Sequence, residues 1–546
     1  MTKDSKAVSS WIDRRRFIQS ATLLAASSVF GCSLTSCNDF EVEIPCLGPA
    51  PPPTPVPGMT YIRASEIGCA LDCDLTNGRS KYKDGAATDD GPRINAALAG
   101  ASATNPITLI IDGSALISGL FLPAGGYWSI AGLGCGTGFF IKTGTNNDGI
   151  HNGPAVWMVD GSGPPAPTRG RNVSLTNFTI NGNEGDGKVG DSTTGYPQGN
   201  LATGQECYPI NLQNLDNIAI ENVVVVNSPC YHLRFTNVGN VAISGCITRS
   251  FGPNTDGLHF EGPANDITIS NCTFTTGDDA IALNCPEGYS GNISRVSVSN
   301  CKFDGPALMR LNTIESAHDP AKFYIDTVSV SNCSGILQNP CFEIGDGAGS
   351  NLNAVTGLTV SNCSLSAPAI LNIWANFGTI ALKNVTLIPS NSGEKAPGYA
   401  LARTDLKLLN PNSGIYVGAS LSFENCTISG SGSSGVSALV IENNSTIANV
   451  EFNGFSLKDC TAKELINIIS GSIGQLVIGS ASSKNIKAPV SAGGFSDIGA
   501  VSGIGVLATG WAFPDAVMAN GVPYISAGTG QASIKVNGIV EPYQPS

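Results

Sequence analysis

The hexapeptide Val-Ser-Val-Ser-Asn-Cys occurs twice in this chain of 546 residues, at positions 296–301 and again at 328–333. Close variants stand on either side, Ile-Thr-Ile-Ser-Asn-Cys at 267–272 and Leu-Thr-Val-Ser-Asn-Cys at 358–363. Apolar and polar residues alternate in each copy, and this period of two predicts a strand. Because the strand recurs about once every thirty residues with no helical pattern in between, we predict stacked coils. The expected fold is all-β, a single-stranded right-handed parallel β-helix.

The bulk composition agrees with one long β-rich solenoid. Gly accounts for 65 residues, and only 13% of residues are charged. The net charge of −13 argues against nucleic acid as a partner. We expect the β-helix domain at residues 59–500, a C-terminal β-rich cap at 501–546, and a short helix at 88–98 that caps the start of the solenoid with Asp89 and Asp90 at its beginning. A monomer without cofactor or metal is expected.

The N-terminus resembles an export signal. Arg14 and Arg15 form a twin-arginine pattern before the charge-free stretch 17–31, so we expect residues 1–31 to be a signal segment. Cys32 ends a lipobox-like sequence, with Cys37 as a competing match, and residues 32–58 form a proline-rich linker. We therefore expect export from a bacterial cell, to the periplasm, the cell surface or the medium, with membrane attachment through lipidated Cys32.

The repeated Asn-Cys pair predicts the contents of each turn. Related turns at Cys246, Cys426 and Cys460 extend the series. Equivalent residues of stacked coils lie about 4.8 Å apart. The cysteines should therefore form an internal stack of small apolar thiols, and the asparagines a hydrogen-bonded ladder. No Cys-x-x-Cys pair or Cys/His cluster has zinc-site spacing. The separation of stacked residues would permit disulfides, but folding in a reducing cytosol before export favours free thiols.

A second strand follows each Cys turn, and inward-pointing apolar pairs such as Leu258 and Phe260 align these strands from coil to coil. The residue between the members of each pair must point outward. The outward positions form one column: Asn211, Arg234, His259, Ala282, Arg310, Glu343 and Asn372. Arg, His and Glu side chains around a small Ala predict a polar groove, and an ordinary solvated face is the alternative.

Three aspartates stand beside this column. Asp256 and Asp279 occupy equivalent positions on adjacent coils, each three residues before the column, and Asp278 lies next to Asp279. Carboxylates are disfavoured in strands and costly to bury, so their presence here indicates a site. Nearby like charges raise at least one pKa, and a protonated acid beside ionised partners is what acid/base hydrolysis of a glycosidic bond requires.

These residues resemble a known family. The segments 253–257 (PNTDG) and 277–281 (GDDAI) resemble the NTD and GDD motifs of glycoside hydrolase family 28, the polygalacturonases and their relatives, which have the pectin-lyase-like β-helix. The resemblance covers roughly residues 170 to 390. It implies inverting hydrolysis without a metal, with Asp278 as general acid and with Asp256 and Asp279 holding and deprotonating the attacking water. Candidate substrate-binding residues are Asn254, Arg234, His259, Arg310 and Glu343.

The chain departs from the family pattern on the next two coils. Where the family has Gly-His-Gly, this chain reads Gly305-Pro306-Ala307, and where the family has Arg-Ile-Lys it reads Phe342-Glu343-Ile344. Arg310-Leu311-Asn312 is an alternative match that skips a coil. A hydrolase of a pectin-like polysaccharide is therefore favoured over a polygalacturonase in the strict sense. A polysaccharide lyase of the same fold, using Ca²⁺ and an Arg base, and a non-catalytic glycan-binding surface solenoid remain alternatives.

Overall fold

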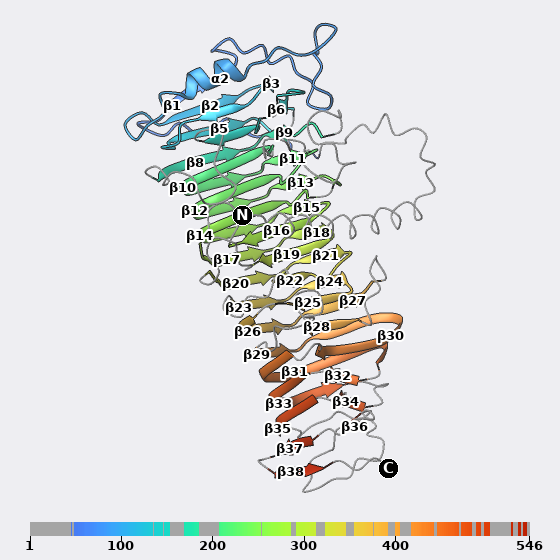
Figure 1. Ribbon diagram of the computed structural model, residues 1–546. Coiled ribbons are helices and arrows are strands. Elements are labelled where there is room, and N and C mark those ends of the chain that lie inside the picture. Colours follow the sequence, from blue (N-terminus) through green and yellow to red (C-terminus); the bar gives the residue numbers. More distant parts are fainter. Residues whose placement is uncertain are drawn as a thin grey trace, which may run out of the picture.

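The computed structural model describes Pro45 and residues 48–542, with gaps at 135, 146, 153–168, 185–206, 253, 286–290, 313–322, 346–353, 375, 391–398, 405–416, 442–444, 463, 469–470, 483–487, 493–495, 503–525, 528–532 and 537–538. The twin-arginine pattern, Cys32 and Cys37 lie outside the described residues. The described chain forms an elongated stack of coils, with the N-terminal coils at one end and the C-terminal coils at the other (Figure 1).

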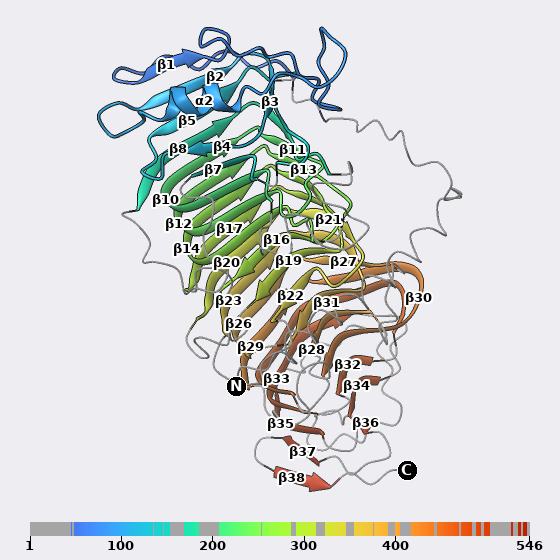
Figure 2. The same cartoon turned by 45° about the horizontal axis from the view of Figure 1, so that its top comes forward.

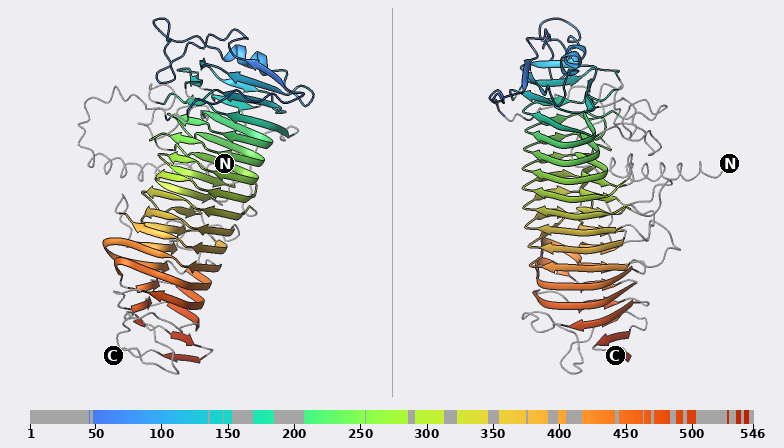
Figure 3. Two further views of the ribbon diagram at one scale, coloured as in Figure 1. Left: turned by 180° about the vertical axis from the view of Figure 1, so that it is seen from behind. Right: turned by 90° about the vertical axis from the view of Figure 1, so that its left-hand side faces the viewer.

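Each coil contributes strands to three faces of the stack, here called sheets A, B and C. Apart from the last strand of the chain, the described strands pair in parallel with their equivalents on neighbouring coils. The tilted view and the two side views show these layers (Figures 2 and 3). Several strands bend from one face into the next. The sequence predicts sheets A and C but misses sheet B, because its strands directly after the Cys turn, such as β13 (Ile247–Arg249), are too short to show a period.

Sheet A contains the strands that precede each Asn turn: β1 (Thr60–Arg63), β2 (Ile107–Ile111), β5 (Trp128–Gly132), β8 (Gly170–Thr176), the second halves of β10 (Ile210–Glu221), β12 (Leu233–Ser244) and β14 (Leu258–Ser270), then β17 (Ile293–Ser299), β20 (Ile325–Ser331), β23 (Ala354–Ser361), β26 (Asn376–Lys383), β29 (Val417–Glu424), β31 (Ser445–Ala462), β33 (Gly471–Ser482), β35 (Ser496–Ser502) and β37 (Ser533–Val536).

Sheet B contains the strands that follow the turn: β3 (Ser114–Ile117), β6 (Gly138–Ile141), β9 (Thr179–Asn181), β11 (Val224–Val226), β13, β15 (Thr273–Thr275), β18 (Lys302–Gly305), β21 (Ser334–Leu337), β24 (Ser364–Ala367), β27 (Thr386–Pro389) and the first part of β30 (Thr427–Ile441). Sheet C contains β4 (Leu120–Leu122), β7 (Ile150–Asn152), the first halves of β10, β12 and β14, then β16 (Asp279–Asn284), β19 (Ala307–Asn312), β22 (Phe342–Ile344), β25 (Ala369–Ile373), β28 (Ala400–Thr404), the end of β30, β32 (Glu464–Ile468), β34 (Ala488–Ala492) and β36 (Ser526–Ala527).

The interior is one continuous apolar core that runs from Ala64 to Ile473. Inward residues of successive coils stack directly on each other, as the rings of Phe235 and Phe260 do at 4.6 Å between centroids. Cys246, Cys272, Cys301, Cys333 and Cys363 are buried free thiols in this core, as predicted. The buried Val385 occupies the equivalent position on the coil between those of Cys363 and Cys426. Because an aliphatic side chain can take the place of a thiol in this series, the thiols serve here as small apolar residues.

One cysteine was wrongly assigned to this stack. In the coil after Cys426, Thr427 pairs with Ser456, so Phe455 takes the equivalent position. Cys460 lies further along β31 and pairs with Ser433 of β30. The sequence Lys-Asp-Cys mimics the repeat, but the left-handed turn of this coil is made by Gly454 at φ 76°. The predicted asparagine turns are otherwise found: these asparagines have left-handed φ angles between 50° and 55°, at Asn271, Asn300, Asn332, Asn362 and Asn425.

The ends of the solenoid are covered differently. Helix α2 (Gly91–Leu98) packs Ile94 and Leu98 into the first coils, where Asp89 Oδ1 accepts the Gly91 N–H. Asp90 was expected to cap the helix, but its side chain makes no capping hydrogen bond. Its carboxylate instead accepts hydrogen bonds from the N–H groups of Ala70 and Leu71. At the other end, parallel pairing continues as far as β37, and β38 (Ile539–Pro542) turns back antiparallel to it.

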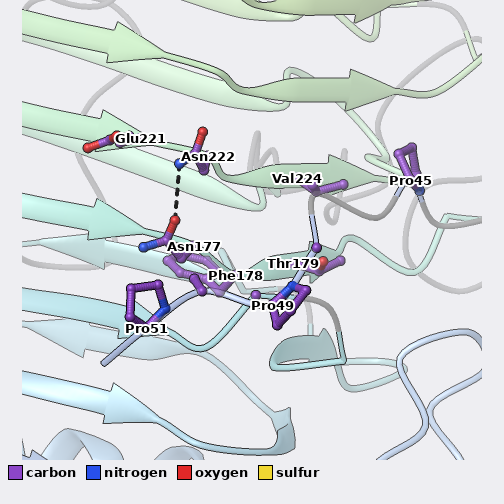
Figure 4. Close-up of a pocket in the computed structure, with 12 residues that line it drawn as sticks. Pro45, Pro49, Pro51, Asn177, Phe178, Thr179, Glu221, Asn222 and Val224 are labelled. Carbon is purple, nitrogen blue, oxygen red and sulfur yellow. Dashed lines mark hydrogen bonds between the residues drawn. The ribbon is translucent and has the colours of Figure 1, made fainter. Parts of the chain in front are cut away.

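Part of the predicted proline-rich linker lies against the solenoid. Pro49 forms an antiparallel bridge with Gly134, and the Ala50 N–H donates to the Leu133 carbonyl at 2.9 Å. Together with the turn at Asn177 and Asn222, this segment lines a pocket of about 370 Å³ (Figure 4). The pocket lies at the turn from sheet A to sheet B, away from the three aspartates at the entry to sheet C. No helix within the described ranges is long and apolar enough to cross a membrane.

Candidate active site

The turns that lead into sheet C bring the two aspartate motifs together. The Thr255 hydroxyl donates to the Gly252 carbonyl at 2.6 Å and accepts the Gly277 N–H at 2.9 Å, so it ties the turn before Asp256 to the turn before Asp278. A Cβ on Gly277 would lie 1.9 Å from the Gly252 carbonyl oxygen. Only glycine permits this approach of the two backbones, which explains the Gly of the Gly-Asp-Asp sequence.

The predicted register is the one observed. His259 pairs with Ala282, Ala282 with Arg310, Arg310 with Glu343, and the column continues on both sides as expected. Asp279 is the first residue of β16 and pairs with Ala307, which confirms that a small apolar residue occupies the position next to it on the following coil.

The three carboxylates form one cluster. One oxygen of each of Asp256, Asp278 and Asp279 lies within 4.8 Å of those of the other two. Asp256 and Asp279 are buried, whereas Asp278 is partly exposed. This spacing would also suit the ligands of a single divalent cation. A water molecule can donate one hydrogen bond of about 2.7 Å to each of two carboxylate oxygens. At a tetrahedral angle these two oxygens are roughly 4.5 Å apart, so a spacing of this size can hold a bridging water.

Asp256 is held on one side only. His259 Nδ1 donates to Asp256 Oδ2 at 2.7 Å, while Asp256 Oδ1 is buried without a hydrogen-bond partner among the described residues. Burial raises the pKa of Asp256; the hydrogen bond and charge of His259 act against this, and the nearby charge of Asp279 adds to it. The His259 ring stacks on Tyr231 at 3.7 Å, and the Asn284 amide lies 3.3 Å from its Nε2. His259 is therefore fixed in orientation toward Asp256.

Asp279 belongs to a chain of ion pairs along the column. Arg310 Nε donates to Asp279 Oδ2 at 2.7 Å, and its Nη2 donates to Glu343 Oε2 at 3.1 Å. On the upstream coils, Arg234 makes two hydrogen bonds to Glu261 at 2.7 and 2.8 Å. Its guanidinium also lies over the Tyr208 ring at 5.0 Å. Two-point pairs of this kind are directional and hold both partners in place.

The column that was predicted to form a polar groove is largely buried among the described residues. His259 is 1% exposed and Glu343 7%, and the Arg310 side chain, at 22%, is among the more accessible members of the column. Asn254 is buried at a left-handed turn, with Nδ2 at 3.7 Å from Cys230 Sγ. The column is a nearly closed polar network because its acids and bases satisfy one another. His259 and Asn254 thus support the aspartates rather than line an open surface.

Sequence reasoning missed a second polar column two residues further along each strand. It consists of buried side chains that pair from coil to coil: Gln213, Thr236, Glu261, Asn284 and Asn312. Glu261 is the partner of both Arg234 and the Thr236 hydroxyl, the latter at 2.8 Å. The signal was available, because residues i and i+2 of a strand point to the same side. Tyr231, by contrast, lies in a turn that no period marks.

A sequence comparison matches the region of this site to the model of a protein family. The sequence model described as glycosyl hydrolases family 28 matches residues 162–306, which contain all three aspartates, so the resemblance to that family is confirmed. No curated protein matches the chain by sequence.

Solved structures share the fold. The surface protein and adhesin PfbA of Streptococcus pneumoniae is 13% identical, with a TM-score of 0.51, over 75% of this chain and 100% of that chain. The tailspike protein of E. coli bacteriophage HK620, in complex with a pentasaccharide, is 9% identical, with a TM-score of 0.51, over 87% of this chain and 80% of that chain. The family 28 exopolygalacturonase of Yersinia enterocolitica is 14% identical, with a TM-score of 0.47, over 74% and 78%.

The adhesin and the tailspike, each with a TM-score of 0.51, support the predicted right-handed parallel β-helix. The family match supports a glycoside hydrolase, and the adhesin and the tailspike show that proteins with other descriptions have the same fold. Function must therefore be argued from the site itself.

Proposed function

From the match of residues 162–306 to glycosyl hydrolases family 28, we propose that this protein hydrolyses a glycosidic bond in a pectin-like polysaccharide by inverting acid/base catalysis. The observation that carries the proposal is the gathering of the Asp256, Asp278 and Asp279 carboxylates within 4.8 Å of one another. Hydrolysis requires a proton donor for the leaving oxygen and a carboxylate that activates water. Inversion is proposed from the family resemblance alone, because the nearest oxygens of this cluster lie closer together than the separation of about 6.5–9.5 Å that is typical of inverting pairs.

Asp278 is the proposed general acid. Among the three aspartates it is the one that is partly exposed, so a leaving oxygen of the substrate can reach it while the other two stay buried. The Thr276 hydroxyl donates to its backbone carbonyl at 2.7 Å, which fixes the turn that presents it. Proton donation to the leaving oxygen contributes about 10²–10⁴-fold in rate for such groups.

Asp256 and Asp279 are the proposed partners of the attacking water. Asp256 Oδ1 has a free acceptor position within the described site, and the spacing of the carboxylates suits a bridging water. The raised pKa of Asp256 makes its ionised form a stronger base. Arg310 offsets the negative charge of Asp279 and orients its carboxylate through the 2.7 Å hydrogen bond.

The proposal is tested with Asp278→Asn, once a screen of pectic, other plant and bacterial polysaccharides has identified a cleaved polymer. The variant keeps the shape of the side chain but cannot donate an acidic proton. We expect about 10²–10⁴-fold slower release of reducing ends from the polymer, with a smaller loss on an aryl glycoside whose leaving group needs little protonation. NMR of the first product should show inverted anomeric configuration.

The matched control is Asp304→Asn, the same exchange at an exposed position in sheet B, which should leave turnover unchanged. Melting temperature should be close to wild type in both variants. Equal turnover by Asp278→Asn and wild type would remove Asp278 from catalysis. A large drop in its melting temperature would mean that the aspartate only shapes the turn.

The same assay separates the two alternative functions. A lyase that holds a cation between the three carboxylates would yield unsaturated products that absorb in the ultraviolet, and would stop on removal of Ca²⁺ by a chelator. An adhesion or binding solenoid would retain the polysaccharide without producing new ends. For localisation, we propose export by the twin-arginine route with attachment through lipidated Cys32, supported by the N-terminal sequence.

A further inference from the structure

Phe251 is an exposed aromatic residue in the turn that connects β13 to Asp256, and it is 72% exposed. Burial of a side chain of this size is favourable, so a phenylalanine that is held in water forgoes that stabilisation. Single exposed apolar residues are nevertheless common on protein surfaces. A function for Phe251 must therefore follow from its position and its surroundings, and not from exposure alone.

The backbone of Phe251 lies beside the turn that carries the proposed general acid. The strands β13 and β15, which lead into the two turns, pair in parallel, with Arg249 opposite Thr275 (Figure 1). A Cβ on Gly277 would lie 2.7 Å from the carbonyl carbon of Phe251. Gly277 immediately precedes Asp278, and consecutive Cα atoms are about 3.8 Å apart. The aromatic side chain therefore emerges next to Asp278.

Hydrogen bonds hold the residues on both sides of Phe251. The Ser250 N–H donates to the Thr275 carbonyl of the next coil at 3.0 Å. The Gly252 carbonyl accepts from the Thr255 hydroxyl at 2.6 Å. A ligand that binds to a side chain on so firmly held a backbone does not have to order the backbone first, which lowers the entropic cost of binding.

The phenyl ring has the chemistry of a platform for a sugar ring. The face of an aromatic ring is negatively polarised, and the C–H groups on the flat side of a pyranose ring are weakly positive, so the two surfaces attract each other and exclude water when they stack. The Arg249 guanidinium lies over the Phe251 ring, 5.8 Å from its centroid, and this cation–π contact favours one orientation of the ring. Since the residue is still 72% exposed beside Arg249, it keeps surface for a ligand.

The surroundings of Phe251 suit a sugar better than a protein partner. In the described part of sheet B, the next exposed large hydrophobic residue is Ile336, three coils further along the stack. Thr275 and Asp304 lie between them, in register with Arg249 and Ile336. The apolar surface is therefore not continuous, whereas a protein interface needs a larger contiguous patch.

We propose that Phe251 is a substrate-binding residue whose ring stacks on the C–H face of a pyranose ring next to the cleaved linkage. This inference rests on the proposed hydrolase function and adds a sugar contact to the three aspartates. Stacking of this kind requires no charge on the sugar, so it suits acidic and esterified residues of a pectin-like polymer alike. Phe251 binds the polymer and takes no part in proton transfer.

Phe251→Ala tests the inference, with Phe251→Trp as the variant that keeps an aromatic face. On the polymer that the screen identifies, we expect the KM of Phe251→Ala to rise about tenfold with kcat nearly unchanged, because stacking stabilises the bound substrate and the transition state alike. Phe251→Trp should keep its KM within about threefold of wild type. Tyr82→Ala removes an aromatic residue that is 79% exposed near the N-terminal end of the solenoid, and it should leave KM unchanged.

An unchanged KM in Phe251→Ala would overturn the inference and leave the hydrolase function intact. A fall in kcat without a change in KM, or a large drop in melting temperature, would also overturn it, because Phe251 would then act by shaping the turn of Asp278. If folded wild-type protein cleaves no polymer, the hydrolase function fails, and electrophoresis through gels that contain the same polysaccharides decides the stacking alone. Weaker retardation of Phe251→Ala than of wild type would support stacking, and equal retardation or none would refute it.

Discussion

At the scale of a single side chain, the proposed function of Asp256 is expected to lower the stability of the fold. Its carboxylate is 4% exposed, one oxygen is held by His259, and the other has no partner among the described residues. Burial of an ionised group without full hydrogen bonding is unfavourable. A buried charge of this kind is retained where it has a function, and at the proposed site Asp256 would accept a hydrogen bond from the attacking water.

We predict that Asp256→Asn stabilises the protein at neutral pH. The pKa of Asp256 is raised in the folded state by burial. Between the ordinary pKa and the raised one, the folded state binds more protons than the unfolded state, so the free energy of unfolding falls as pH rises, and the full penalty applies above the raised pKa. Removing the charge should therefore increase this free energy at pH 7.

Denaturant unfolding of both proteins at pH 7 and pH 3 measures the effect. At pH 3 Asp256 is protonated in folded and unfolded states alike, so the gain should vanish there. A variant that is less stable than wild type at pH 7 would contradict the prediction, because it would mean that the ionised carboxylate strengthens the fold. Hydrolysis should fall in the same variant, whichever way its stability moves.

At the scale of the element, the turn from sheet A to sheet B depends on one residue per coil in a left-handed conformation. Asparagine fills this position at Asn300, Asn332 and Asn362, and glycine fills it at Gly245. Asparagine tolerates positive φ and bonds along the stack, as the Asn384 amide does to Asn362 Oδ1 at 2.9 Å. Glycine tolerates the conformation without the bond.

We predict that Asn332→Ala lowers the free energy of unfolding by about 1–2 kcal/mol more than Asn332→Gly does. Both variants lose the side-chain amide, but alanine must also adopt the φ of 54° that its Cβ disfavours. Unfolding in urea, compared between the two variants, isolates the backbone contribution. Equal losses would show that the ladder, and not the left-handed turn, accounts for the asparagines.

The repeat made the strand register predictable. The ion pairs between side chains of neighbouring coils could not be predicted from it. The column from Asn211 to Asn372 followed from period-two alternation, because a slip by one residue would expose the apolar pairs. The closure of that column did not follow: the pairing of Arg310 with both Asp279 and Glu343 depends on side-chain reach across coils. Cys460 was misassigned because its triplet imitates the repeat while the true turn contains Gly454.

At the scale of the whole molecule, we predict that replacing Arg14 and Arg15 with Lys keeps the protein in the cytoplasm. Both residues lie outside the described part of the chain, and the expectation rests on the twin-arginine pattern before an apolar stretch. Cell fractionation with an antibody measures the distribution. Arg171→Lys, the same exchange on an exposed part of the solenoid, should be exported as usual. Undiminished export of the double variant would refute the twin-arginine assignment.

The pairing of each coil with only its two neighbours also governs how the molecule assembles. Most of the described strand pairings join residues roughly one repeat apart in the chain, so closing each such loop costs little entropy once the preceding coil exists. Folding can therefore begin at any coil and add one coil at a time in either direction. A destabilising substitution in one coil would therefore divide the solenoid into two segments that unfold separately, and each segment would keep its own folded coils.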